Sequence, residues 1–275
     1  MLPSRCTAMS HPLNTPLGRF GIVTSEDGPH GCLASIPAGG MVNPLTGAPT
    51  IATLAMLVDH VGGIVNHHRR LPDEWTLTSE LSLEVRPDAS DVIAAAPDVP
   101  VAATARPFGA KSDVALALCE FTHRETTLAT ATVRSFYIRT PGHLTEFPGG
   151  PTGPMPPGAL SDRMAIRVAE SGGAAKVLMQ LPDPVLNNSL GIVHGGVSAV
   201  ALELVAAAAV NAGREGQPLH TASLRVNFIR PFRSSPESRY VGTALRVGRR
   251  SGIGEAQAVG PDGEVAIIAR LTAYG

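Results

Sequence analysis

One pattern occurs twice in the chain: a stretch of apolar residues long enough for a helix, interrupted by a single carboxylate. The stretches cover residues 50–59, which end at Asp59, and residues 194–203, which end at Glu203. Charged side chains are rarely buried without a partner, so a lone acid in an apolar helix needs a structural or chemical reason. The repetition predicts two related units, each built around a buried helix, within the 275 residues of the chain.

The segments around the two helices also repeat in the same order. Each half has a short strand-like run, an asparagine-containing loop that ends at a glycine, the apolar helix, and then runs in which apolar and polar residues alternate. Such alternation is typical of a strand with one covered face. The second half has one extra residue before the Arg-Pro that follows this strand, and we expect a bulge or a strand-end irregularity there. The expected strands are residues 31–37, 78–87 and 127–138 in the first half, and 175–182, 221–231 and 264–274 in the second.

Residues 141–158 separate the two halves and are rich in proline and glycine. Proline removes backbone donors and glycine resists ordering, so this segment is expected to run over the surface as a linker. We therefore predict a lead segment at 1–19, a first unit at 20–140, the linker at 141–158 and a second unit at 159–275. One central helix followed by several antiparallel strands makes each unit an α+β fold.

Charge and cysteine content argue against several classes of partner. The chain has 22 Lys and Arg against 23 Asp and Glu, without long runs of like charge, so nucleic acid is not an expected partner. Three scattered cysteines have neither disulfide nor metal-ligand spacing, which suits a reducing compartment. No signal peptide is recognisable, and the longest apolar run is too short to span a membrane. These features predict a cytoplasmic protein that does not enter a membrane.

The second helix opens with His194-Gly195-Gly196, carries Glu203 nine residues after the histidine, and precedes the strand motif LRVNFIRP. The first half has Asp59 and the motif LSLEVRP, with Thr50-Ile51-Ala52 in place of His-Gly-Gly. This combination resembles the PaaI-like branch of the hotdog-fold acyl-CoA thioesterases. The resemblance implies one helix wrapped by an antiparallel sheet in each unit, here fused as a double hotdog. It further implies an acyl-CoA substrate, no metal or bound cofactor, and room for a homo-oligomer of double-hotdog units.

Helical geometry indicates that neither helix can work alone. Nine residues make two and a half turns, which separates His194 from Glu203 by about 13 Å along the axis and turns them to opposite faces. A pseudo-two-fold axis between the units would bring the acid of one helix to the N-terminus of the other. We therefore expect one site with Gly195, His194 and Asp59. A second site with Thr50 and Glu203 is expected to be degenerate, because the branched side chain of Ile51 stands where a carbonyl would approach.

The first site has the groups that cleavage of a thioester needs. The free N–H of Gly195, at the positive end of the helix dipole, could polarise the carbonyl and stabilise an oxyanion. Asp59 would act as a general base on water or as a nucleophile, and both routes stay open. The resemblance gives Asn188 a role in orienting the nucleophile or the carbonyl, and Thr78 a role in positioning water. His194 would hold the loop or the carbonyl, and Glu203 would be a relic, a structural acceptor or a second acid.

Two other functions remain alternatives at this stage. One is a hotdog hydratase or dehydratase acting on enoyl- or hydroxyacyl-thioesters, although the sequence has no Asp followed five residues later by His in the expected loop. The other is a non-catalytic acyl-CoA binding protein, which the loss of His-Gly-Gly from the first half would suit.

Overall fold

In the computed structural model, residues 8–147, 149–155, 158–169 and 174–275 are described. Their strands form a single antiparallel sheet of 13 strands in the order β1-β2-β3-β5-β6-β7-β4-β10-β13-β12-β11-β9-β8. The first half of the chain supplies β1 (Met9–Ser10), β2 (Val23–Gly28), β3 (Gly31–Ile36), β4 (Glu74–Val85), β5 (Val101–Phe108), β6 (Val114–His123) and β7 (Thr126–Arg139). The second half supplies β8 (Ile166–Ala169), β9 (Lys176–Gln180), β10 (His220–Phe228), β11 (Arg239–Val247), β12 (Ser251–Val259) and β13 (Val265–Tyr274).

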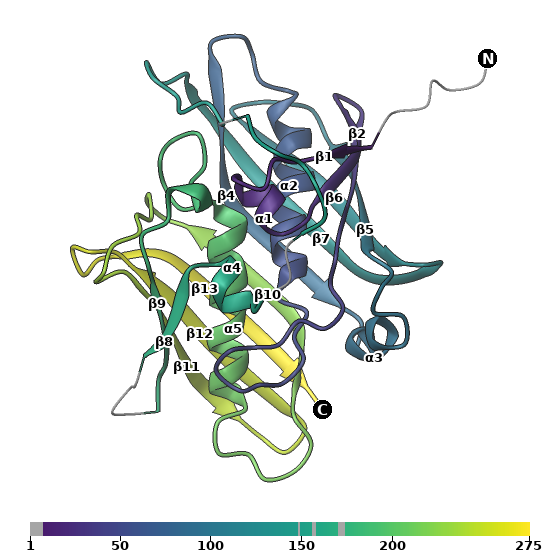
Figure 1. Cartoon of the computed structure of the whole chain (residues 1–275), viewed down its shortest axis with the longest axis vertical. Helices are drawn as coiled ribbons and strands as arrows, with labels where there is room; N and C mark the ends of the chain where they lie inside the picture. The colour runs from purple at the N-terminus through teal and green to yellow at the C-terminus, as the bar shows by residue number, and fades with distance from the viewer. Residues whose placement is uncertain (1–7, 148, 156–157, 170–173) are drawn as a thin grey trace.

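Two long helices, α2 (Thr53–His67) and α5 (Gly195–Val210), form the centre of the two halves. Each packs on the strands of its own half, and the two helices also contact each other (Figure 1). Both are largely buried because nearly all of their residues are apolar or small. Shorter helical segments are α1 (Pro16–Arg19), α3 (Ala89–Ala94), α4 (Leu160–Arg163) and the 3-10 turn η1 (Pro184–Leu186). The predicted α+β architecture of two helix-and-sheet units is confirmed.

The two halves join through β4 and β10, which pair antiparallel from Ser223 opposite Glu84 to Asn227 opposite Glu80. These are the two strands that carry the LSLEV and LRVNF motifs. Because they lie at the middle of the strand order, the sheet runs without interruption from one unit into the other. The paired strands β4 and β10 are therefore the junction between the two halves, which we call the seam, and they hold α2 and α5 side by side.

One local expectation from the sequence is wrong. The first apolar helix begins at Thr53 rather than Thr50, since the Thr50 hydroxyl accepts the N–H of Ala52 and residues 50–52 form only the approach to α2. The expected irregularity at Arg-Pro is present, since the N–H groups of Ile229 and Arg230 both donate to the carbonyl of Ala266. A further irregularity of β10 lies between Thr221 and Ser223. A matching irregularity lies between Thr78 and Glu80 of β4. Both strands are thus bulged directly after their threonine, and a bulge re-aims the neighbouring side chain.

The segments that flank the first unit are attached to it and to the second half. β1 pairs with β2, and the N–H of Leu13 donates to the carbonyl of Pro151 in the linker. The linker N–H of Thr145 donates to the carbonyl of Ser189. The division into residues 1–19, 20–140, 141–158 and 159–275 stays a prediction. Among the described residues, no helix combines the length and the apolar character that a membrane crossing needs.

Candidate active site

Asp59 lies in the middle of α2, directly beside the N-terminus of α5. One of its carboxylate oxygens, Oδ2, is 3.3 Å from Nδ1 of His194, and the side chain is 8% exposed. A Cβ placed on Gly195 would lie 3.0 Å from the same oxygen. The absence of a side chain at Gly195 therefore leaves a narrow approach between the carboxylate and the first N–H groups of the helix. The acid comes from one half and the helix N-terminus from the other.

His194 caps α5 rather than extending into solvent. Its Nδ1 accepts the N–H of Gly196 at 3.1 Å, so in this tautomer the ring carries its proton on Nε2. Burial lowers the pKa of His194, and the nearby Asp59 carboxylate opposes that shift. The imidazole is consequently neutral near pH 7, and the partial positive charge at this end of the site comes from the helix itself.

Thr78 approaches Asp59 from the other side. Its hydroxyl donates to Oδ1 of Asp59 at 3.3 Å, and it stands at the bulge of β4 described above. Asn188 lies in the loop ahead of α5, where its Oδ1 accepts the N–H of Leu190 at 2.9 Å. Its Nδ2 has no hydrogen-bond partner within the described part of the chain, which leaves that group for a bound molecule.

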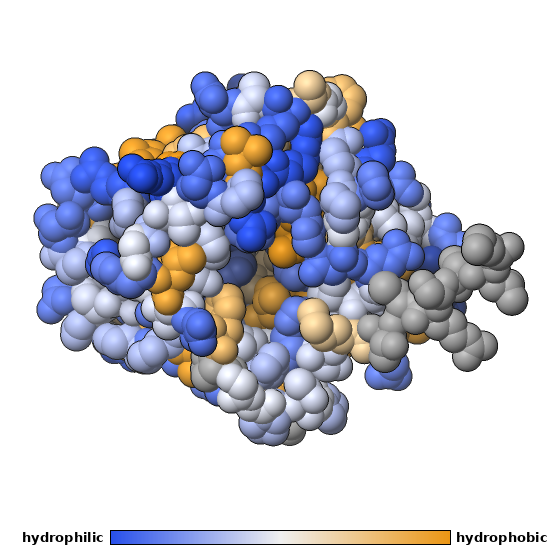
Figure 2. Space-filling view, turned by 90° about the horizontal axis from the view of Figure 1, so that it is seen from above, coloured by the Kyte–Doolittle hydropathy of each residue, from blue (hydrophilic) through white to orange (hydrophobic). Residues whose placement is uncertain are grey.

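These five residues, Asp59, Thr78, Asn188, His194 and Gly195, line one cavity of about 550 Å³. Much of its remaining wall is apolar or aromatic, with Ile64, Trp75, Leu77, Phe136, Phe228 and Phe232 among the lining residues. Seen from above, apolar residues are visible inside a hollow near the centre of the molecule (Figure 2). A cleft with apolar walls and a few convergent polar groups is the usual form of a small-molecule site.

The counterpart around Glu203 is more closed. Glu203 is 3% exposed; Thr221 donates to its Oε1 at 2.5 Å and Thr50 to its Oε2 at 3.4 Å. Burial raises the pKa of Glu203 to about 7, although both threonine hydrogen bonds oppose the shift. Asn43, which corresponds to Asn188, uses its Nδ2 to donate to the carbonyl of Leu204 at 2.9 Å. Beside Asp59, the side-chain amide of Asn188 is free to bind a ligand. Beside Glu203, the corresponding amide of Asn43 is already hydrogen-bonded within the fold.

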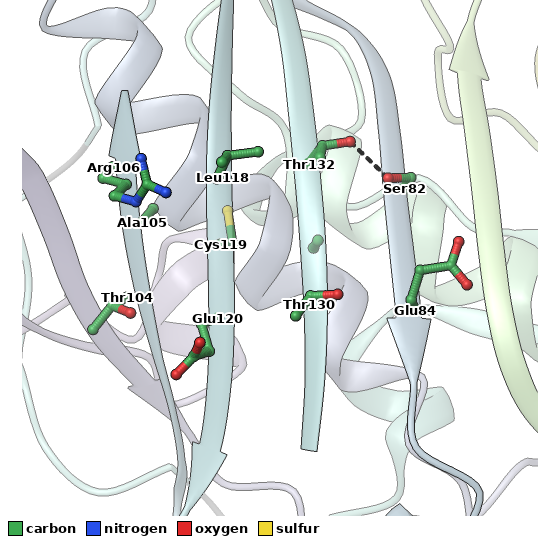
Figure 3. Close-up of a pocket in the computed structure, with 11 residues that line it drawn as sticks. Ser82, Glu84, Thr104, Ala105, Arg106, Leu118, Cys119, Glu120, Thr130 and Thr132 are labelled. Carbon is green, nitrogen blue, oxygen red and sulfur yellow. Dashed lines mark hydrogen bonds between the residues drawn. The ribbon is translucent and has the colours of Figure 1, made fainter. Parts of the chain in front are cut away.

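A second cavity, of about 460 Å³, lies on the sheet of the first half and contains none of the residues predicted for the site. Figure 3 shows that polar side chains from β4, β5, β6 and β7 line it, among them Glu84, Arg106 and Glu120. The hydroxyls of Ser82 and Thr132 are hydrogen-bonded to each other at 2.6 Å. Glu84 is paired with Arg225. This cavity lacks a carboxylate held against a helix terminus and is not a candidate for the same chemistry.

The sequence did not single out three residues that the structure brings to these sites. Thr221 holds Glu203 as Thr78 holds Asp59, and the repeated strand motif was a signal that could have identified it. His60 and His11 line the same cavity as Asp59. His60 follows Asp59 in the chain, but its Nε2 is hydrogen-bonded to the hydroxyl of Thr24 and not to the Asp59 carboxylate. His11 belongs to the lead segment, where no pattern indicated a role.

Comparison with known proteins gives the fold a name. Residues 190–267 match the model of the Thioesterase superfamily, whereas a search of curated proteins found no match. A tesB protein of Mycobacterium avium subs paratuberculosis is 14% identical, with a TM-score of 0.57, over 91% of this chain and 94% of that one. An acyl-CoA thioesterase II of Mycobacterium marinum is 13% identical, with a TM-score of 0.56, over 94% of this chain and 97% of that one.

A third structure, a conserved protein with a hot dog fold from Alicyclobacillus acidocaldarius, is 15% identical, with a TM-score of 0.52, over 91% of this chain and 94% of that one. All three likenesses extend across both halves. The narrower assignment to the PaaI-like branch stays a prediction. The chain therefore has the double hotdog fold, and its second half, over residues 190–267, is similar to the thioesterase superfamily.

Proposed function

We propose that this protein is an acyl-CoA thioesterase, which hydrolyses an acyl-CoA to a free acid and coenzyme A. The observation that carries the proposal is the Asp59 carboxylate held against the glycine-bearing N-terminus of α5, inside a largely apolar cavity. The match of residues 190–267 to the Thioesterase superfamily supports it, as does the similarity to the acyl-CoA thioesterase II of M. marinum. The proposal includes a cytoplasmic location and allows a homo-oligomer.

In this proposal the N-terminus of α5 binds the thioester carbonyl. The N–H of Gly195 has no partner inside the helix and lies at the positive end of its dipole, so it stabilises the oxyanion that forms when the carbonyl is attacked. Nδ2 of Asn188 is a second donor on the same cavity wall. His194 keeps the helix N-terminus in place by capping Gly196.

Asp59 supplies the attacking group by one of two routes. As a general base it takes a proton from a water that adds to the carbonyl, and the tetrahedral intermediate expels the CoA thiolate, which is then protonated. As a nucleophile its carboxylate displaces the thiolate to form an anhydride, which water hydrolyses. The hydroxyl of Thr78 orients the carboxylate in both routes. A single turnover in ¹⁸O-water tests the nucleophilic route, because label enters Asp59 only when water attacks the aspartyl carbonyl of the anhydride. In the general-base route the label enters the product acid and never Asp59.

The proposal is tested by measuring free thiol release from a panel of short, long, branched and aromatic acyl-CoAs. We expect turnover of some members, and an Asp59→Asn variant that folds normally and loses at least about 100-fold in kcat/KM. Crotonyl-CoA that gains water without releasing thiol would instead indicate a hydratase. Tight binding of acyl-CoA with no turnover across the panel would indicate a binding protein. Undiminished turnover in Asp59→Asn would remove the acid from the mechanism.

A further inference from the structure

A second polar cluster stands in the wall of the Asp59 cavity. It contains His11 of the lead segment, Thr24 of β2 and His60 of α2. The Thr24 hydroxyl is 2.9 Å from Nε2 of His11 and 2.9 Å from Nε2 of His60, and the two rings meet edge to face with their centroids 5.5 Å apart. Thr24 is 3% exposed, so this hydroxyl is enclosed by the two imidazoles.

The cluster offers hydrogen-bonding groups that the fold leaves unused. Burial lowers the pKa of His60 to about 3 and also lowers the pKa of His11, so both rings are neutral near pH 7. A neutral imidazole has one N–H donor and one acceptor nitrogen. The Nε2 atoms are engaged with Thr24, whereas neither Nδ1 has a hydrogen-bond partner among the described residues. Both residues line the cavity, so these nitrogens are available to its occupant.

The position of the cluster relative to the reacting groups restricts what it can bind. His60 follows Asp59 directly in α2, so the two residues differ by a rise of about 1.5 Å and a turn of about 100°. His60 also lies near enough to His194 for that ring to contribute to its lowered pKa, and both line the one cavity, so a group bound at His60 is near a thioester carbonyl held at Asp59 and Gly195. An acyl chain without polar atoms would cover these nitrogens and leave them unpaired, which is unfavourable.

We propose that His11 and His60, joined through Thr24, form a polar subsite that binds a hydroxyl or keto oxygen on the first few carbons of the acyl group. The preferred substrates are accordingly oxygen-substituted acyl-CoAs rather than plain hydrocarbon ones. This inference rests on the proposed thioesterase function and specifies its substrate class. A hydroxyl both donates and accepts, and a keto oxygen accepts from a ring N–H, so either group suits a neutral imidazole.

The test compares acyl-CoAs that differ only in the oxygen substituent. Butyryl-CoA is compared with its 2-hydroxy, 3-hydroxy and 3-oxo derivatives through kcat/KM for thiol release. We expect at least one derivative to be favoured by about tenfold, the effect of one good hydrogen bond. His60→Phe and His11→Phe should bring that ratio close to one. The matched control is His30→Phe, which changes an exposed histidine in the turn between β2 and β3 and should keep the ratio.

A binding measurement on the wild-type protein separates failure of the subsite from failure of the proposed function. Non-hydrolysable thioether analogues of the same acyl-CoAs are titrated by calorimetry, which needs no turnover. A lower Kd for the oxygen-substituted analogues without any thiol release would support the polar subsite and overturn the proposed thioesterase function. Equal Kd values and equal kcat/KM values across the wild-type series overturn the subsite, while thiol release alone keeps the thioesterase. Because these comparisons use the wild-type chain, they decide the proposal even if a histidine variant fails to fold.

Discussion

Asp59 and Glu203 occupy the same position in the two helices, yet their surroundings give them different chemistry. Each accepts a hydrogen bond from the threonine at the bulge of the adjoining strand, Thr78 or Thr221. Asp59 faces a helix that begins with glycines, and it borders the cavity. Glu203 has a second hydroxyl, from Thr50, and is almost fully buried. One repeated arrangement thus borders a cavity in the first copy and is enclosed within the fold in the second.

Burial of Glu203 makes the stability of the protein depend on pH. Because the pKa of Glu203 is raised from 4.5 to about 7, the folded state holds a proton that the unfolded state releases. The resulting stabilisation is complete below pH 4.5 and is lost as the pH rises through 7. Glu203→Gln should therefore gain up to about 3 kcal/mol on the wild type between pH 4.5 and pH 8. Urea unfolding of both proteins across this range measures the difference, and a pH-independent difference would contradict the account.

The two glycines at the start of α5 have separate tasks. A Cβ on Gly195 would meet Oδ2 of Asp59 at 3.0 Å, whereas a Cβ on Gly196 would meet the Met56 sulfur at 2.6 Å and the Met56 Cα at 3.0 Å. Gly195→Ala should lower kcat/KM by about 100-fold through displacement of the carboxylate, with little change in Tm. Gly196→Ala should lower the free energy of unfolding by about 1–3 kcal/mol, because the backbone of α2 must move. Thermal melts and thiol-release assays on both variants would show the reverse pattern if these tasks were assigned wrongly.

Among the elements, the sequence predicted the two buried helices and six of the described strands, including the short β3 and β9, and gave no bounds for the other strands. The apolar runs identified α2 and α5, and alternation identified β4, β7, β10 and β13, because burial of one face requires those patterns. The start of α2 was misplaced. Threonine is a common N-cap residue, but the Thr50 hydroxyl accepts the N–H of Ala52, ahead of the first residue of the helix. β1, with two residues, has no periodicity to read, so the contribution of His11 to the cavity could not be predicted. The repeat of helix and acid allowed us to predict that Asp59 lies beside Gly195. His60 could not be predicted in this way, because the second helix has no histidine at the corresponding position.

The face of α2 that meets the sheet and the face that meets the cavity can be distinguished by two adjacent glycines. A Cβ on Gly62 would lie 2.4 Å from Cγ2 of Val133 in β7, whereas a Cβ on Gly63 would have only the Thr78 hydroxyl nearby, at 3.9 Å. Gly62→Ala should destabilise the protein by about 1–3 kcal/mol through overpacking. Gly63→Ala should stabilise it by about 0.5–1 kcal/mol, because alanine favours the helix. Denaturant unfolding compares them directly, and equal effects would mean that α2 is rotated from the position described.

At the scale of the whole molecule, the pairing of β4 with β10 explains why the chain contains two units. The strands that carry Thr78 and Thr221 belong to the seam, so each threonine reaches the acid of its own helix. The same seam sets α2 beside α5, and Asp59 then meets the N-terminus that its own helix cannot offer. Within a single unit, the acid and the N-terminus of its helix are too far apart to act on one substrate atom. The fused arrangement also frees the two copies to diverge, which a symmetric pair of identical units could not do.

We propose that this divergence leaves one working site, composed of Asp59 from the first half and Gly195 from the second. The most direct test measures kcat/KM for thiol release by Asp59→Asn and Glu203→Gln side by side, with the best acyl-CoA found for the wild type and at a pH where both variants are folded. We expect a loss of at least about 100-fold for Asp59→Asn and a value near the wild type for Glu203→Gln. Equal losses in both variants, or a larger loss in Glu203→Gln, would contradict it.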